Sequence, residues 1–132
     1  LNDEEVNYIC IGIEPKFDEL ITIPDIIYHI APIKFLDKIQ SKGLIPKYQE
    51  KMSFHPDRIY CALDQSKANK IGGMLKRYVN SAVAVLTIDG KALKQKGVKF
   101  FKDPNYNGGV FTHENIPPDL IISVDPFDDG ED

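Results

Sequence analysis

Apolar residues along the chain fall into short runs that predict a series of strands. The runs are rich in β-branched and aromatic residues and are bounded by proline, glycine and aspartate, which is typical of strands. The predicted strands are residues 6–13, 26–31, 58–63, 82–88, 98–101, 110–112 and 120–124. The run at 82–88 is apolar enough to lie in the centre of a sheet.

Helical spacing of apolar residues predicts a first helix directly after the strand at 26–31. Ile33, Leu36 and Ile39 fall on one helical face. Pro32 suits the first turn, because its missing N–H has no helical partner there. Gly43 suits the C-terminal cap, because glycine adopts the left-handed conformation without strain. The helix is therefore expected to end at Gly43.

A second helix is predicted over residues 65–78, with Asp64 as its N-cap. Gly72-Gly73 weakens this helix by about 1 kcal/mol per glycine, so we expect a kink or close packing there. After Asp89-Gly90 a short helical piece runs through Leu93. Strands and helices do not alternate regularly, and this order favours the α+β class over a βαβ repeat.

The length of 132 residues predicts one domain over residues 1–127, followed by an acidic and disordered tail at 128–132. The net charge of −4 argues against broad, charge-driven binding to nucleic acid. A local basic site stays open, because lysines are spread through residues 34–102.

The cellular location is predicted from the cysteines and from the apolar runs. Cys10 and Cys61 lie in apolar runs and are expected to be free buried thiols in a reducing compartment, with a disulfide as the alternative. No run reaches the roughly 18–20 apolar residues of a membrane span, and no signal peptide is visible. We therefore expect a cytoplasmic protein with no membrane partner. The start at Leu1, which fits a processed or excised chain, leaves this open.

The strand at 26–31 carries the best candidate for chemistry, His29. A histidine fixed near the end of a strand can serve as a hydrogen-bond partner for a small ligand. The alternative is a core histidine with its hydrogen bonds satisfied inside the protein. Tyr28 points to the opposite face of the strand and is expected in the core.

Several kinds of site are disfavoured by the residue spacing. A metal site is not expected, because His29, His55 and His113 lie in distant segments without zinc-type spacing. The sequence contains no Gly-x-Gly-x-x-Gly, Walker loop or Gly-x-Ser-x-Gly. This disfavours Rossmann-type NAD binding, nucleotide hydrolysis and serine-hydrolase chemistry.

Three blocks, in order, carry a resemblance to a known family. The first is Tyr28-His29-Ile30-Ala31 with a helix that ends at Gly43-Leu44. The second is Arg58-Ile59-Tyr60-Cys61-Ala62-Leu63. The third is Asn107-Gly108-Gly109-Val110-Phe111-Thr112, followed by Ile116-Pro117-Pro118-Asp119-Leu120-Ile121. Together they resemble the ADP-ribosyltransferase fold of NAD-consuming transferases, which includes the RNA 2′-phosphotransferases. The resemblance implies split, mixed β-sheets with two main short helices.

The resemblance also implies a site for NAD as co-substrate, without a metal. In that family the bond between nicotinamide and ribose breaks through an oxocarbenium-like state. His29 would hydrogen-bond a ribose hydroxyl, the backbone of Ile30 would meet the nicotinamide amide, and Tyr60 would stack on its ring. Arg58 and Asn107 would also contribute to cofactor binding, and in the 2′-phosphotransferase branch Arg58 would bind the RNA phosphate. Core packing is the alternative for Tyr60.

The third signature position of the family, a glutamate in many members, has no clear match. Asn107 or Gly108 aligns near it, and Glu114 follows a few residues later beside His113. Either Glu114 completes a catalytic set with His29 and Tyr60, or the glutamate is missing, as in the 2′-phosphotransferases. Glu114 and His113 also fit a solvated loop pair.

The resemblance leaves three functions open. The first is an NAD-dependent transferase of ADP-ribose to a protein or nucleic acid acceptor. The second is a catalytically inactive binding domain of the same fold, and the third is an RNA 2′-phosphotransferase.

Overall fold

The computed structural model describes residues 19–46, 58–104 and 106–127. The predicted strand at 6–13, the residues Cys10 and His55, and the acidic tail at 128–132 lie outside these ranges.

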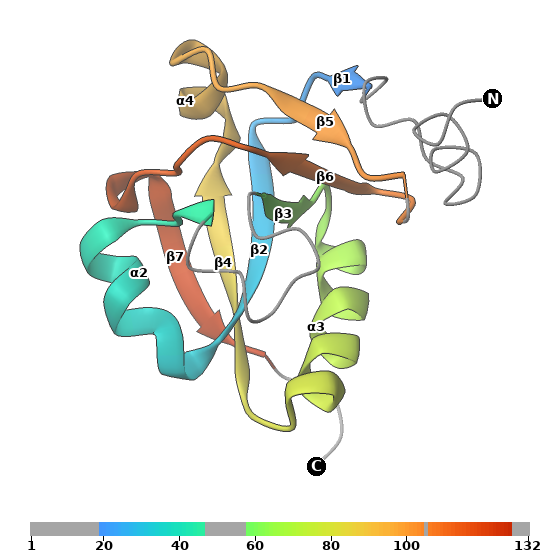
Figure 1. Ribbon diagram of the computed structural model, residues 1–132, viewed down its shortest axis with the longest axis vertical. Helices are drawn as coiled ribbons and strands as arrows, with labels where there is room; N and C mark the ends of the chain where they lie inside the picture. The colour runs from blue at the N-terminus through green and yellow to red at the C-terminus, as the bar shows by residue number, and fades with distance from the viewer. Residues whose placement is uncertain (1–18, 47–57, 105, 128–132) are drawn as a thin grey trace, which may run out of the picture.

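Within the described ranges the chain forms a seven-stranded sheet with the order β1-β5-β6-β3-β2-β4-β7 (Figure 1). The strands are β1 (Leu20–Ile21), β2 (Ile26–Pro32), β3 (Ile59–Ala62), β4 (Val83–Asp89), β5 (Phe100–Lys102), β6 (Gly109–Thr112) and β7 (Ile121–Pro126). The helices are α2 (Leu36–Lys42), α3 (Gln65–Val79) and α4 (Gly90–Gln95), with 3-10 turns η2 (Ile33–Phe35) and η4 (Pro118–Leu120).

The predicted α+β class is confirmed, but the expected mixture of strand directions is not seen among the described strands. Every described pairing is antiparallel. The physical reason is the position of β2. Both β3 and β4 run antiparallel to β2, so they are parallel to each other, and α3 is the helical crossover that joins them. Because β2 lies between them, the two parallel strands do not pair.

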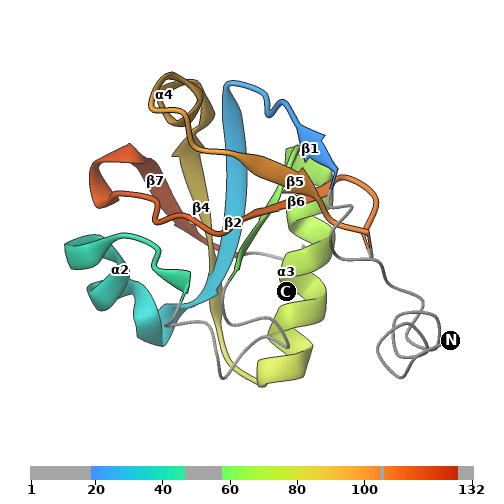
Figure 2. The same cartoon turned by 45° about the horizontal axis from the view of Figure 1, so that its top comes forward.

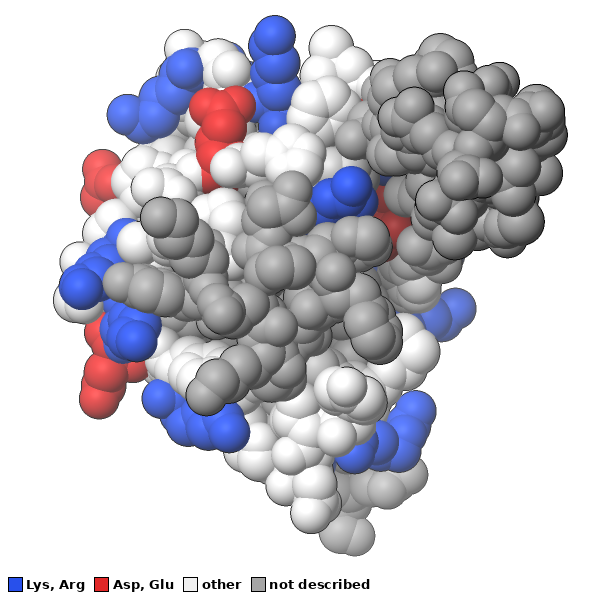
Figure 3. Space-filling model, in the orientation of Figure 1, with Lys and Arg blue, Asp and Glu red and all other residues white. Residues whose placement is uncertain are grey.

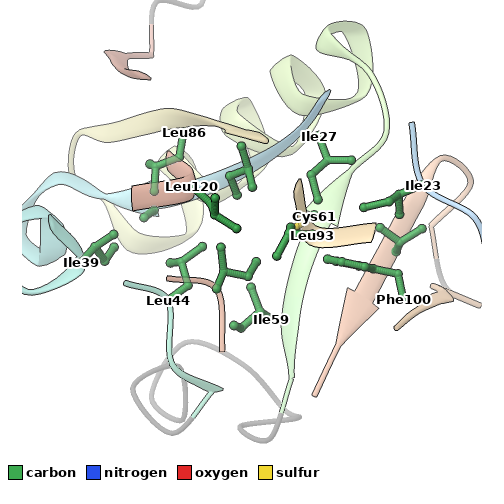
Figure 4. Packing of buried hydrophobic residues seen from close by; sticks show 14 of the residues in the cluster. Ile23, Ile27, Ile39, Leu44, Ile59, Cys61, Leu86, Leu93, Phe100 and Leu120 are labelled. Carbon is green, nitrogen blue, oxygen red and sulfur yellow. The ribbon is translucent and has the colours of Figure 1, made fainter. Parts of the chain in front are cut away.

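Two hydrophobic clusters lie on opposite faces of the sheet, as the alternation along β2 requires. Ile27 and Ala31 face the larger cluster, which also receives Ile39 of α2 and Leu93 of α4 (Figure 4). Ile30 faces the smaller cluster under α3, and the partly buried Tyr28 packs against that cluster from the same face. Figure 2 accordingly shows α3 on one side of β2 and α2 on the other.

The helix ends largely follow the predicted caps. The Asp64 side chain accepts a hydrogen bond from the backbone N–H of Lys67 at 2.8 Å and caps α3. Gly43 follows α2 with φ +79°, and a Cβ there would collide with the backbone oxygen of Ile116. Pro32 differs from the prediction: it ends β2 and precedes a 3-10 turn, so the α-helix begins only at Leu36.

At Gly72-Gly73 the close packing is found at the first glycine. A Cβ on Gly72 would lie 2.7 Å from the Phe127 ring, so α3 approaches the segment after β7 closely there. The two-residue strand β1 was not predicted, because two residues are too few to show a period.

Cys61 is a free, buried thiol, as predicted for that residue. Burial raises its pKa far above the ordinary range. Among the described residues, no helix is both long and apolar enough to cross a lipid bilayer.

Candidate functional site

The two central strands β2 and β3 separate almost as soon as they meet. Their described register consists of one pair, Tyr28 with Ala62. A continued ladder would bring Ile30 opposite Tyr60. Instead, the side chain of His29 makes the link, because its Nδ1 lies 2.6 Å from the backbone oxygen of Tyr60. The separation of the two strands therefore begins at His29.

A cavity of about 170 Å³ opens at this separation, against the inner face of α3. It is lined by Tyr28, His29, Ile30 and Pro32 from β2, by Arg58, Tyr60, Cys61 and Ala62 from β3 and the residue before it, and by Ile71 and Leu75 from α3. The lining is mostly apolar with a few polar groups, which is typical of a small-ligand site. The cavity thus brings together four residues that the sequence predicts for the site: His29, Ile30, Arg58 and Tyr60.

The protonation state of His29 follows from its surroundings. The carbonyl oxygen of Tyr60 can only accept, so Nδ1 carries the proton and donates it. Burial lowers the pKa of His29 below 6.5, and the hydrogen bond to Tyr60 only partly opposes this effect. The ring is therefore neutral at pH 7, and Nε2 is a bare acceptor.

This Nε2 atom is buried, and no described residue pairs with it. An unpaired acceptor in an apolar environment costs free energy unless a ligand supplies the donor. A ligand hydroxyl that reaches the cavity would meet this requirement. His29 therefore bonds within the fold through Nδ1, and its Nε2 is a buried acceptor to which no described residue donates.

Arg58 and Tyr60 form the polar side of the cavity. Nη1 of Arg58 donates to the Tyr60 hydroxyl at 3.5 Å, and its guanidinium lies 4.3 Å from the centroid of the Phe111 ring. The Tyr60 and Phe111 rings pack with centroids 5.7 Å apart. This stack fixes the Tyr60 ring and holds a permanent positive charge beside the cavity.

Glu114 and Asn107, the alternatives for the third signature position, do not line the cavity. The Glu114 carboxylate accepts a hydrogen bond from the backbone N–H of Lys99 at 3.0 Å, and its own N–H donates to Thr112 Oγ1. Asn107 is exposed in the turn before β6. Their roles stay predictions.

The sequence did not point to the cavity residues contributed by α3. Ile71 and Leu75 are spaced by one helical turn, and this spacing predicts a shared apolar face. Placing that face over His29 requires the crossover of α3 above β2, which no local pattern shows. In the described part of the chain, no group of three or more His, Cys, Asp or Glu residues could hold a metal ion.

Comparison with known proteins finds a partial similarity to a curated protein. No family model matches the chain. Over 101 residues it is 29% identical to a protein of Pseudomonas fluorescens strain Pf-5 named "Probable RNA 2'-phosphotransferase". The match covers 76% of this chain and 47% of that protein, so the chain spans about half the length of the curated relative. The name of that protein corresponds to one branch of the family that the sequence resembles, the RNA 2′-phosphotransferases.

Proposed function

We propose that this domain binds NAD at the His29 cavity and transfers ADP-ribose to a 2′-phosphate of RNA. The observation that carries the proposal is the buried acceptor nitrogen of His29 at the point where β2 and β3 separate. The similarity to a protein named as an RNA 2′-phosphotransferase supports the choice of acceptor. It favours RNA over the broader prediction of any protein or nucleic acid acceptor.

The size of the cavity suits one aromatic ring of the dinucleotide. Its volume is about 170 Å³, and an apolar cavity of about 150 Å³ can accept benzene. The nicotinamide ring would occupy it, with Tyr60 beside the ring and Ile71 and Leu75 behind it. A ribose hydroxyl would then donate to Nε2 of His29. The rest of NAD would lie outside the cavity.

In the proposed reaction a phosphate oxygen of the RNA forms a bond to the ribose carbon, and nicotinamide leaves with the electron pair of the broken bond. Arg58 would hold the acceptor phosphate through its planar fork of donors. The protein supplies position and electrostatic stabilisation, and such contributions lower a barrier without covalent catalysis.

The proposal is tested by incubating the chain with NAD and a 2′-phosphorylated oligoribonucleotide and measuring released nicotinamide by chromatography. We expect release that requires the 2′-phosphate and is lost in His29→Ala. The same oligonucleotide without the phosphate is the matched control. If calorimetry shows no NAD binding and no nicotinamide appears, the proposal is wrong.

A binding domain without catalysis is the second candidate. Relative to a transferase that uses the family's glutamate, it is favoured by the lining of the cavity, to which no described carboxylate contributes. This candidate predicts NAD binding that depends on His29 and Tyr60, with no nicotinamide release for any acceptor. Release that depends on the 2′-phosphate would exclude it.

A further inference from the structure

Helix α3 carries a positive net charge, whereas the net charge of the whole chain is negative. Between Gln65 and Val79 the helix contains no acidic residue, although the chain has a net charge of −4. Its cationic residues are Lys67, Lys70, Lys76 and Arg77. Figure 3 shows Lys and Arg side chains, without Asp or Glu beside them, at the end of the molecule where the second half of α3 lies. This is the local basic site that the overall charge left open.

A groove of about 450 Å³ lies along the outer face of this helix. It is lined by Asn69, Lys70, Gly73, Met74, Arg77, Tyr106 and Phe127. Among the described residues, two cations thus line it and no carboxylate does. In the described part of the chain neither Lys70 nor Arg77 makes an ion pair. Their seven-residue spacing places the two Cα atoms about 10 Å apart along the helix, so they would contact separate anionic groups.

Two aromatic rings of the groove are held by contacts outside it. The Tyr106 hydroxyl donates to the backbone oxygen of Lys67 at 3.4 Å. The Phe127 ring packs against Gly72, and the backbone N–H of Phe127 donates to the oxygen of Val83 at 2.9 Å. Fixed rings are good stacking surfaces, because little conformational freedom is lost when a flat ligand binds.

Gly73 leaves space in the helical wall of the groove. Within the described part of the chain, a Cβ at this position would meet only Nη1 of Arg77, at 3.8 Å, and no other atom within 4 Å. The neighbouring Gly72 is different, because its missing side chain is replaced by the Phe127 ring. The opening at Gly73 thus lies beside both the cation of Arg77 and the groove.

We propose that this groove binds a single-stranded stretch of the RNA acceptor, away from the His29 cavity. Lys70 and Arg77 contact backbone phosphates, and a base stacks against Tyr106 or Phe127. The pairing of cations with aromatic rings is how proteins hold single strands without reading their sequence. An acidic peptide would use the cations but not the rings. The choice of RNA rests on the proposed function.

The first test measures binding of a short, fluorescein-labelled, single-stranded RNA by anisotropy, without NAD and without a 2′-phosphate. We expect the double variant Lys70→Gln/Arg77→Gln to bind the RNA at least about tenfold more weakly at 0.1 M salt. In a plot of the logarithm of the association constant against the logarithm of the salt concentration, the magnitude of its slope should fall by about 1.4, or about 0.7 for each lost phosphate contact. The matched control is Lys91→Gln/Lys96→Gln, which removes two exposed cations: Lys91 lies in α4 and Lys96 is its C-cap residue. An equal loss in the control would show a general charge effect and overturn the proposal.

The second test blocks the groove without removing a charge. Gly73→Leu would place a side chain in the open space, and it would also favour the helix, since glycine is a poor helix former. We expect this variant to fold, to keep NAD binding, and to lose RNA affinity about tenfold, as for the loss of one stacked base. Gly73→Ala, with one added methyl group, is the size control and should bind RNA nearly as well as the wild type.

Wild-type RNA affinity in Gly73→Leu, or displacement of the RNA by polyglutamate at equal charge concentration, would overturn the proposal. RNA binding and NAD binding are measured separately. A chain that binds RNA in this groove but does not bind NAD would disprove the proposed reaction alone. A chain that releases nicotinamide normally while its groove variants bind RNA unchanged would disprove the groove alone.

Discussion

His29 donates from Nδ1 to the backbone oxygen of Tyr60 across 2.6 Å, where the ladder between β2 and β3 has already ended. This one contact fixes the orientation of the ring, its tautomer and the strand that carries Tyr60. The same ring therefore contributes to the stability of the fold and, through its other nitrogen, to the proposed site.

The two roles of His29 are expected to separate in two variants. The amide of His29→Asn can replace Nδ1 but not Nε2, so this variant should keep most of the stability and lose about tenfold in nicotinamide release, equivalent to one hydrogen bond of roughly 1.4 kcal/mol. His29→Gln reaches the position of Nε2 but leaves the Tyr60 oxygen unpaired, so it should lose about 1–3 kcal/mol of stability. Urea unfolding and nicotinamide release measure the two effects. Wild-type behaviour of His29→Asn in both assays would show that Nε2 binds no ligand.

Stability is expected to fall at mildly acidic pH because of the same ring. The pKa of His29 is lowered from 6.5 in the folded protein, so the unfolded chain binds the proton more readily. The contribution of neutral His29 to the free energy of unfolding is fully present above pH 6.5. It is lost as the pH falls toward the lowered pKa, with a slope of at most about 1.4 kcal/mol per pH unit. Urea unfolding from pH 7.5 to 5 should therefore show a steeper decline for the wild type than for His29→Asn. Equal slopes would contradict the burial argument.

Filling the cavity should block NAD more than it disturbs the fold. Ala62 and Ala84 are each 1% exposed, but only Ala62 lines the cavity. Ala62→Leu has open volume for its added atoms, whereas Ala84→Leu overpacks a filled core and should cost about 1–3 kcal/mol. We expect Ala62→Leu to be the more stable of the two and to lose NAD binding in calorimetry. Normal NAD affinity in Ala62→Leu would place the ligand elsewhere.

Gly43 should be far less replaceable than Gly97, although both have positive φ. Gly43 has φ +79° and ψ −168°, a region almost restricted to glycine, and its Cβ would collide with the backbone of Ile116. Gly97 has φ +80° and nothing within 4 Å of the position of its Cβ. Gly43→Ala should cost more than about 3 kcal/mol, and Gly97→Ala about 1–2 kcal/mol. Equal thermal shifts would show that the contact at Ile116 relaxes freely.

The third signature position can be tested through Glu114. Its carboxylate contacts the backbone of Lys99 and does not line the cavity. We therefore expect Glu114→Gln to change nicotinamide release by less than about threefold, whereas loss of an acid–base group costs about 10²-fold or more. Asn107→Ala is the parallel variant in the turn before β6. A hundredfold loss in either one, with NAD binding unchanged, would identify the missing catalytic residue.

Much of the fold within the described residues could be predicted because its signals are local. The cap at Asp64 depends on one side chain and the cap at Gly43 on the backbone of one residue, and the strand of Val83–Asp89 is marked by its own apolar run. Strand direction is different. The parallel strands β3 and β4 do not pair because β2 lies between them, and this position depends on contacts between segments far apart in the sequence.

The candidate site was predictable in part for the same reason. His29, Tyr60 and Arg58 were found from their strands and from the resemblance, and the cavity brings them together. Ile71 and Leu75 line the cavity through the crossover of α3, and the groove on the other face of that helix combines Lys70 with Tyr106 and Phe127 from two later segments. No spacing rule joins such residues, because only the tertiary fold brings them near each other.

The position of α3 between the cavity and the groove has a thermodynamic consequence. Ile71 and Leu75 line one site, and their direct neighbours Lys70 and Met74 line the other. A ligand that shifts this helix at one site changes the geometry of the second. By linkage, if the first ligand changes the affinity for the second by some factor, the second ligand changes the affinity for the first by the same factor. Helix α3 is thus the element through which the two sites would cooperate or compete.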